Sequence, residues 1–286
     1  MLRSLIRKGT VAGGDFMSPA TTGLAIAAFS MMFLVACATS PLGRQQLQLF
    51  SDEMMADMGR TAFDNLLSEE KLARDRAVTR YVNCVADRII AALPPEQQSG
   101  WDVRVLADDQ LNAFALPGRK IGVYQGLLKA ARNQHQLATV IGHEVAHVLA
   151  EHGNERLSTS YAAEAGLQLV GGLIGDPGSS QSRTVMALLG LGTQVGVLLP
   201  FSRTQEAEAD LLGLDLMADA GFDPGASIEL WQNMAAESKG TPPEFLSTHP
   251  GPDSRMRSLQ KRMPMAEARL EAALRRGNRP DCRPER

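Results

Sequence analysis

Four of the five histidines in this 286-residue chain lie between residues 135 and 152. Two of them, His143 and His147, are four residues apart within the largely apolar segment Val140–Val148. On a helix, residues four apart share one face and lie about one turn from each other. Two imidazoles in this arrangement can chelate one zinc ion, and Glu144 beside them can handle the protons of a water molecule. The segment therefore predicts a buried helix that carries a metal site.

A catalytic zinc ion needs a third protein ligand and an open position for water. The spacing turns His152 to the opposite face of the predicted helix, and His135 lies two turns upstream, so we expect both to be surface residues. A better candidate is Glu206 in a second helical segment, where Asp210 lies four residues further along the same face. One carboxylate can ligate zinc, and the other can accept the free ring N–H of a ligating histidine. The alternative for this pair is a solvated acidic helix face.

The composition excludes several classes of protein. A net charge of −3 gives no electrostatic reason to expect a nucleic-acid partner. Hydrophobic residues make up 44% of the chain and charged residues 21%, so most of it is expected to fold around a core. Three cysteines are too few for a disulfide-dense scaffold or for a four-cysteine zinc site.

Residues 1–36 differ in character from the rest of the chain. A positively charged start precedes an apolar run over residues 23–36, which is too short to span a membrane but suits the core of a signal peptide. The run ends in Leu34-Val35-Ala36-Cys37, which resembles the lipobox of a bacterial lipoprotein, where the cysteine is lipidated and becomes the mature N-terminus. Ala38 is the kind of residue that outer-membrane lipoproteins usually carry next. The alternatives are an ordinary secretory signal with an incidental cysteine, and a start at Met17.

Export would place the two remaining cysteines, Cys84 and Cys282, in an oxidising compartment. We expect them to form a disulfide that links opposite ends of the mature domain. Two unpaired thiols are the alternative.

Helical periodicity covers most of the mature chain, and β-strand patterns are confined to one region. The expected helices cover residues 54–67, 72–93, 134–152, 201–220, 223–237 and 254–276. The expected strands cover residues 103–106, 112–116 and 120–124. The Ala/Gly/Leu-rich stretch 161–199 is expected to form buried helices or a flap. The predicted fold class is mainly α with a small antiparallel β-sheet (α+β).

Three motifs follow one another in a fixed order. They are Gly142-His-Glu-Val-Ala-His147, Arg203 with Glu206-Ala-Glu-Ala-Asp210, and Ser247-Thr-His-Pro250 with Arg255. The ordered set resembles the gluzincin peptidase family that includes the CAAX prenyl protease, HtpX and the mitochondrial overlapping-activity peptidase. It is most similar to bacterial periplasmic lipoprotein members, such as the β-barrel-assembly-enhancing protease and the low-osmolarity-induced lipoprotein protease. The resemblance covers roughly residues 40–270 and includes Thr39-Ser-Pro-Leu-Gly-Arg-Gln-Gln-Leu47. It does not extend to the helical-repeat domain of the assembly-enhancing protease.

The resemblance implies a zincin-like fold with one Zn²⁺ per chain, and it assigns roles to individual residues. The implied zinc ligands are His143, His147 and Glu206, the implied catalytic residue is Glu144, and the residue that orients a ligand histidine is Asp210. His249 matches a loop histidine that approaches the zinc, either as a fourth ligand in a latent state or as a group that stabilises the transition state. The alternative for His249 is an ordinary loop residue. Asn112-Ala113-Phe114-Ala115 resembles an edge strand that aligns the substrate as an added β-strand.

We therefore expect a signal peptide over residues 1–36, a lipidated tether over 37–50 and a single metallopeptidase domain over 51–286. The expected function is that of a zinc endopeptidase of the bacterial periplasm, anchored by its lipid to the outer membrane. Its expected substrates are unfolded or misassembled envelope proteins. The alternative is a largely latent, zinc-containing chaperone or assembly factor for outer-membrane proteins. A processing protease of the prenyl type is disfavoured, because no segment is long enough to span a bilayer repeatedly.

Overall fold

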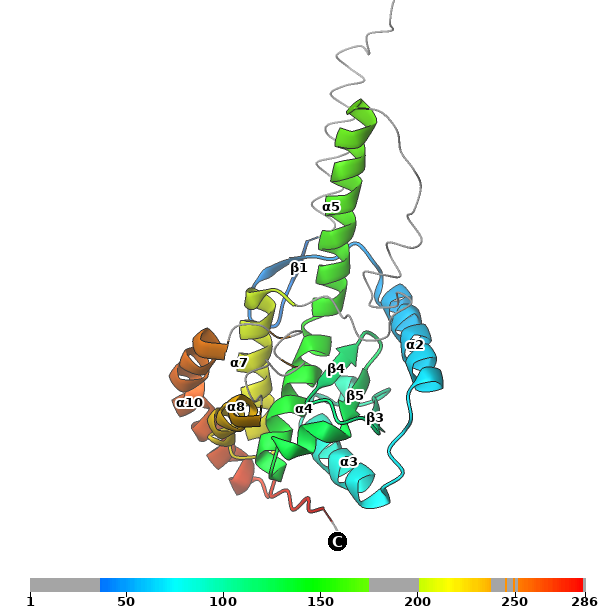
Figure 1. Ribbon diagram of the computed structural model, residues 1–286. Coiled ribbons are helices and arrows are strands. Elements are labelled where there is room, and N and C mark those ends of the chain that lie inside the picture. The colour runs from blue at the N-terminus through cyan, green and yellow to red at the C-terminus, as the bar shows by residue number, and fades with distance from the viewer. Residues whose placement is uncertain (1–36, 175–200, 238–244, 246–248, 250–251, 285–286) are drawn as a thin grey trace, which may run out of the picture. The chain divides into compact units, whose positions relative to one another are not determined.

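The computed structural model describes residues 37–174, 201–237, 245, 249 and 252–284 (Figure 1). The expectations for residues 1–36, and for most of the stretch 161–199, lie outside the described residues. The helices are α2 (Asp52–Glu69), α3 (Arg76–Ala91), α4 (Gln134–Leu149), α5 (His152–Ile174), α7 (Arg203–Asp219), α8 (Ala226–Glu237) and α10 (Pro252–Arg275). The strands are β1 (Cys37–Thr39), β2 (Gln45–Leu47), β3 (Asp102–Leu106), β4 (Ala113–Leu116) and β5 (Lys120–Tyr124), with short 3₁₀ helices at Pro95–Gln97 and Gln125–Lys129. No helix in this part of the chain is long and apolar enough to cross a membrane.

Polar side chains mark where the two site-bearing helices begin. The side chain of Asn133 accepts hydrogen bonds from the first backbone N–H groups of α4. At the start of α7, Ser202 and Gln205 form a reciprocal capping box. Such caps satisfy backbone donors that have no partner within the helix, so they fix the residue at which each helix starts.

The three-stranded sheet is mixed, and the prediction of a wholly antiparallel sheet was wrong. The strand order is β3-β5-β4, with β4 antiparallel and β3 parallel to the central strand β5. The turn at Pro117-Gly118 makes β4 and β5 an antiparallel hairpin. The chain passes from β3 to β4, which lies on the opposite side of the central strand β5. The strands β3 and β4 therefore do not pair with each other. Alternating hydrophobicity identifies strands, but it does not encode which neighbour a strand pairs with.

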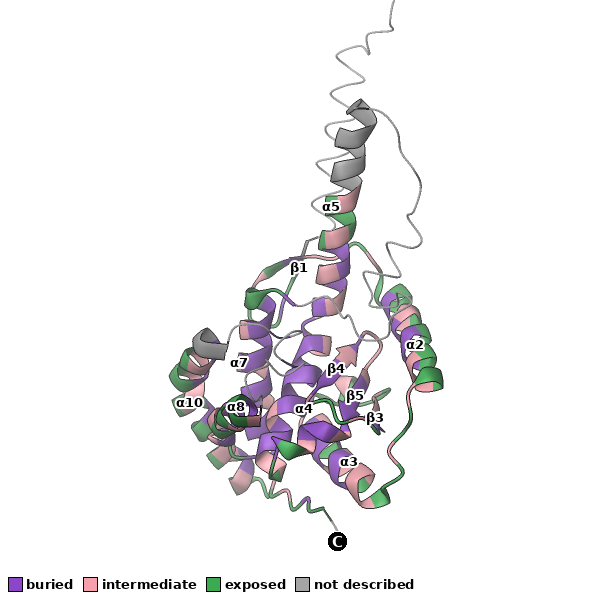
Figure 2. Ribbon diagram, in the orientation of Figure 1, coloured by how far each residue is buried: buried purple, intermediate pink, exposed green. Residues whose placement is uncertain are grey.

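Helix α4 lies at the centre of the domain, between the sheet and α7 (Figure 1). It is buried over most of its length (Figure 2), because apolar residues surround it on several faces. Its neighbours include α3 and α8 as well as α7 and β4. The core around it includes the fully buried residues Ile89, Ile121, Leu137, Ile141, Met217 and Phe222. A helix in this position holds its polar side chains away from bulk solvent.

Two glycines allow α4 and α7 to come into close contact. A Cβ atom at Gly213 would lie 2.8 Å from the backbone nitrogen of His143, and one at Gly142 would lie 2.9 Å from the carbonyl oxygen of Gly213. Both distances are too short for real Cβ contacts, so any larger residue would push the helices apart. The glycines therefore bring the motif on α4 beside the motif on α7.

The two ends of the described domain are attached to the core by different contacts. A disulfide joins Cys84 on α3 to Cys282 in the C-terminal tail, the first of the two arrangements that the sequence left open. At the other end, Gln46 donates a 2.7 Å hydrogen bond to the carbonyl oxygen of Ala150, and Leu49 donates one of 2.8 Å to the side chain of Ser158. Part of the expected tether therefore packs along the junction of α4 and α5.

Candidate metal centre

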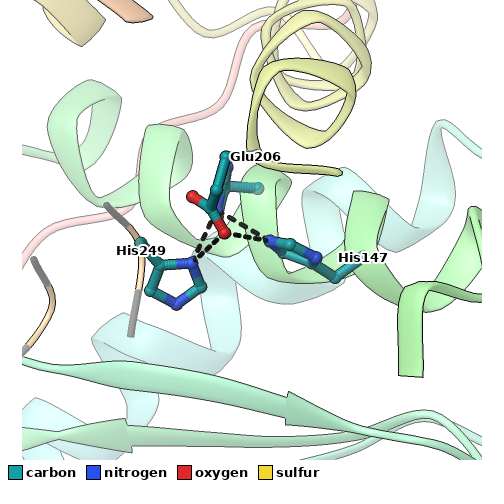
Figure 3. A group of neighbouring side chains, drawn as sticks. His147, Glu206 and His249 are labelled. Atoms are coloured by element: carbon teal, nitrogen blue, oxygen red, sulfur yellow. Dashed lines mark hydrogen bonds and ion pairs between the residues drawn. The ribbon is translucent and has the colours of Figure 1, made fainter. Parts of the chain in front are cut away.

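Four buried side chains from three parts of the chain converge on one point. His143 and His147 come from α4, Glu206 comes from α7, and His249 precedes α10; one ligand atom of each lies within 4.8 Å of the others. Figure 3 shows the Glu206 carboxylate between the rings of His147 and His249. Its Oε1 lies 2.8 Å from His249 Nδ1 and 3.4 Å from His147 Nε2, which in turn is 3.0 Å from His143 Nε2.

This donor set fits a zinc ion. Imidazole nitrogens and a carboxylate oxygen are ligands that zinc prefers, and four of them suit its tetrahedral geometry. Burial disfavours the charge on Glu206, but the charge of His249 and hydrogen bonds from His143 and His147 hold its pKa well below the usual range. A carboxylate that stays ionised while fully buried is suited to a cation.

The histidine at the start of the motif is oriented from behind by Asp210. Its carboxylate oxygen Oδ1 lies 3.2 Å from Nδ1 of His143, which leaves Nε2 directed at the other three donors. Burial disfavours the charged form of Asp210, but Arg255 outweighs that effect and lowers the pKa. This is the position that the resemblance implied for Asp210.

Arg255 connects the metal centre to α10, a role that sequence reasoning missed. It is 3% exposed and donates two 2.6 Å hydrogen bonds to Asp210. Its Nη1 lies 2.7 Å from Glu206 Oε2 and donates a 3.1 Å bond to the carbonyl oxygen of His249. The available signal was its place at the end of the third motif. One guanidinium therefore holds three of the site residues together.

The protonation of His143 predicts how zinc affinity depends on pH. Burial alone would lower the pKa of His143, but hydrogen bonds to Asp210 and Glu206 outweigh it and raise the pKa to about 9. The raised pKa favours the protonated ring in the metal-free chain, and a metal ion must displace that proton. We expect zinc affinity to fall about tenfold for each pH unit below about 9. Competition titrations with a chelator of known pH dependence measure this, and an affinity that is constant between pH 7 and 8.5 would contradict it.

Glu144 lies next to the four donors but accepts a hydrogen bond from none of them. Both of its carboxylate oxygens are buried and accept no hydrogen bond from the described residues. Nε2 of His249 lies 3.6 Å from Oε1 of Glu144. Burial raises the pKa of Glu144, so the carboxylate is a stronger base than one in water. A buried base that accepts no hydrogen bond and lies beside a cation site is suited to accept a proton from a water molecule.

His152 is buried, so the expectation of a surface residue was wrong. Its Nδ1 lies 2.9 Å from Nδ1 of His147, and its Nε2 lies 3.2 Å from a carboxylate oxygen of Glu208. The error arose because α4 ends at Leu149 and Glu151 adopts a left-handed backbone with φ of 52°. His152 therefore begins a new helix, and its direction does not follow from its spacing along α4.

His135 lies outside this cluster. It is half-buried, and its Nδ1 accepts a 3.0 Å hydrogen bond from the backbone of Asp223. Its ring packs edge-on against Phe222 at 5.9 Å between centroids. This histidine therefore supports the local packing of the chain rather than the metal centre.

The strand that the sequence associated with substrate lies at an edge of the sheet. Within the described sheet, β4 pairs only with β5, so its other side has no strand partner. Phe114 points into the core, where its ring packs 6.5 Å from that of Phe63. A cavity of about 300 Å³ is lined by Ala115 and Leu116 of this strand and by His147 and Phe201. The cavity thus connects the edge strand with a residue of the metal centre.

Comparison with known proteins gives consistent results. Residues 73–263, about two thirds of the chain, match the model of peptidase family M48. The chain is 35% identical over 221 residues to the mitochondrial metalloendopeptidase OMA1 of Schizosaccharomyces pombe, covering 76% of this chain and 63% of that protein. It is 31% identical over 233 residues to the human mitochondrial metalloendopeptidase OMA1, covering 79% and 44%.

A bacterial protein is similar over the same region. The chain is 30% identical over 217 residues to the beta-barrel assembly-enhancing protease of Yersinia pestis, covering 74% of this chain and 44% of that protein. The chain therefore spans less than two thirds of the length of each of these three relatives.

Proposed function

Because the chain belongs to peptidase family M48, as its resemblance implied, we propose that it is a zinc-dependent endopeptidase. The observation that carries this proposal is the buried carboxylate of Glu144, which accepts no hydrogen bond from the described residues and lies beside four converging metal-ligand side chains. A cation site without an adjacent base would suit a structural zinc ion. A base in this position suits hydrolysis.

The residues of the site divide the work of peptide-bond hydrolysis. Zinc held by His143, His147 and Glu206 would supply Lewis-acid polarisation of the scissile carbonyl and lower the pKa of the attacking water. Glu144 takes the proton of that water during attack and delivers it to the leaving amine, which its raised pKa favours. Asp210 keeps the Nδ1 proton of His143 in place, so that Nε2 remains available as a ligand.

Strand β4 would hold the substrate as an additional β-strand. Its residues Ala115 and Leu116 line the same cavity as His147, so an extended peptide on β4 can lie with one bond near the metal centre. Main-chain pairing reads little of the side-chain sequence. We therefore propose that Asn112, Ala113, Phe114 and Ala115 select exposed or unfolded segments rather than a defined motif.

The cellular role that we propose is quality control in the bacterial cell envelope. It includes Cys37 as the lipid anchor, and it is supported by the signal-like sequence of residues 1–36 and by similarity to a beta-barrel assembly-enhancing protease. The OMA1 relatives are mitochondrial by name, so the shared region itself serves in more than one compartment. The proposed substrates are misfolded or misassembled membrane and periplasmic proteins.

A latent form, close to a chaperone or assembly factor, is the second candidate, and His249 is the observation that favours it. Its Nδ1 is one of the four clustered ligand atoms, so His249 can occupy the position that a catalytic site leaves open for water. His249→Ala would free that position.

Purified protein should therefore be assayed for zinc content and for cleavage of casein, wild type beside His249→Ala. We expect one zinc ion per chain and chelator-sensitive cleavage. Cleavage by the variant alone would indicate a latent protease. Zinc binding without cleavage by either protein would contradict the proposed activity and favour the assembly factor.

A further inference from the structure

A chain of polar contacts leads from the metal centre to the N-terminal segment. Nδ1 of His147 contacts Nδ1 of His152 at 2.9 Å, and Nε2 of His152 contacts Oε2 of Glu208 at 3.2 Å. The same oxygen of Glu208 accepts a 2.9 Å hydrogen bond from Nε of Arg44. Both His152 and Glu208 are buried, and Arg44 is partly buried. The contacts thus connect His147 with Arg44, although Arg44 and Glu208 are 164 positions apart in the sequence.

The chemistry of these groups permits only one direction of hydrogen bonding. Arg44 can only donate, and the carboxylate of Glu208 can only accept. His152 must therefore carry its proton on Nε2, which leaves Nδ1 as an acceptor in the neutral ring. His147 then donates from Nδ1, and its Nε2 lone pair is directed at the other metal-ligand atoms.

Arg44 itself is held firmly in this position. Its guanidinium lies between two carboxylates: Nη2 donates a 2.7 Å bond to Glu155, Nη1 contacts the same group, and Nε reaches Glu208. Gln205 donates a 2.7 Å bond to Glu155 from α7, and Ser40 accepts a 3.0 Å bond from the backbone of Arg44. A planar guanidinium paired with two carboxylates has little freedom to rotate, so it fixes the orientation of Glu208.

We propose that Arg44, Glu208 and His152 are positioning residues that hold His147 in its metal-binding tautomer and thereby strengthen zinc binding. Arg44 lies in Thr39–Leu47, a segment of the resemblance to which the proposed activity assigns no role. By this proposal the segment that follows the proposed lipidation site also helps to orient a ligand of the metal centre. The proposal rests on the proposed function for the identity of the metal and its ligands.

The test is the affinity for zinc, measured by competition with a chromogenic chelator in the absence of peptide. Partners that orient a ligating histidine typically contribute 10–100-fold to metal affinity. We expect Arg44→Ala and Glu208→Gln each to weaken zinc binding at least about tenfold. Both residues act through His152. The double variant should therefore bind zinc about as tightly as the weaker-binding of the two single variants. Arg44→Lys, which can still donate to Glu208, should recover part of the loss.

Arg262→Ala is the matched control. Arg262 pairs with Asp215 on α7 and is exposed to a similar degree as Arg44, but this pair lies outside the contacts to the metal centre. Its loss should lower thermal stability without changing zinc affinity. Zinc affinity within about twofold of wild type in folded Arg44→Ala would overturn the proposal. If Arg44→Ala does not fold, the nearly isosteric Glu208→Gln decides by the same criterion.

The measurement separates this proposal from the proposed function. A wild-type protein that binds zinc but cleaves nothing would contradict the peptidase activity and leave the affinity comparison intact. Normal cleavage by wild type together with unchanged zinc affinity in Arg44→Ala and Glu208→Gln would contradict only the positioning role.

Discussion

Replacement of Glu144 by glutamine is expected to lower the rate of peptide hydrolysis by about 10²–10⁴-fold, the usual contribution of a general base. Glutamine has nearly the same shape, but its amide cannot take up a proton from water at neutral pH. Because Glu144 is not one of the four clustered ligand residues, the variant should still bind one zinc ion per chain. Casein cleavage and metal content, measured on the same preparation, check both parts of this prediction.

Glu267→Gln provides the control for a change of charge. Glu267 lies exposed on α10 and has no contact with the site. The substitution removes the same negative charge, so the variant should cleave at the wild-type rate. Undiminished cleavage by pure Glu144→Gln would contradict the proposed mechanism. Loss of cleavage together with loss of zinc would instead show that Glu144 maintains the metal centre.

Replacement of Arg255 by methionine is expected to destabilise the metal-free protein by about 3–5 kcal/mol, the usual cost of breaking a buried ion pair. The variant removes the positive charge that neutralises Asp210 and contacts Glu206, and both carboxylates remain buried. Methionine keeps much of the volume, so the loss reports the unpaired charges rather than a cavity. Urea unfolding in the presence of a chelator measures this change in the free energy of unfolding.

Arg262→Met is the comparison for this substitution. Arg262 is partly exposed, and its partner Asp215 keeps a second ion-pair partner in Arg269 after the substitution, so we expect a loss of no more than about 1 kcal/mol. Equal losses from the two variants would contradict the view that Arg255 is a buried structural centre of the site.

The helices that carry the site were predictable because their signals are local. Apolar periodicity and helix caps lie within a few residues of each boundary, and the spacing of His143 and His147 already places them on one face. Glu206 was found because α7 has the same kind of spacing. Gly142 and Gly213 allow α4 and α7 to lie side by side, because a Cβ atom at either position would clash with the other helix. This role of the two glycines is visible only once both helices are in place.

The errors concern groups whose surroundings come from distant parts of the chain. The direction of β3 depends on which strand lies beside it, and the alternating pattern of that strand is the same in either direction. His152 was misplaced because the left-handed residue Glu151, which ends the helical register, is not a glycine and gave no local signal. The sequence assigned no role to Arg255, because nothing local indicates that a charged side chain will be buried between carboxylates.

The disulfide between Cys84 and Cys282 has a consequence for the lifetime of the protein. A peptidase that takes up extended segments can also digest copies of itself, and loose chain ends are where such digestion starts. The disulfide fastens the C-terminal tail to α3, whose inner face lies in the core, so the tail cannot peel away as an extended strand from residue 282 inward. Under the proposed activity, the resistance of this segment to self-digestion should therefore depend on the redox state of the surroundings, since a reductant would release Cys282 from α3.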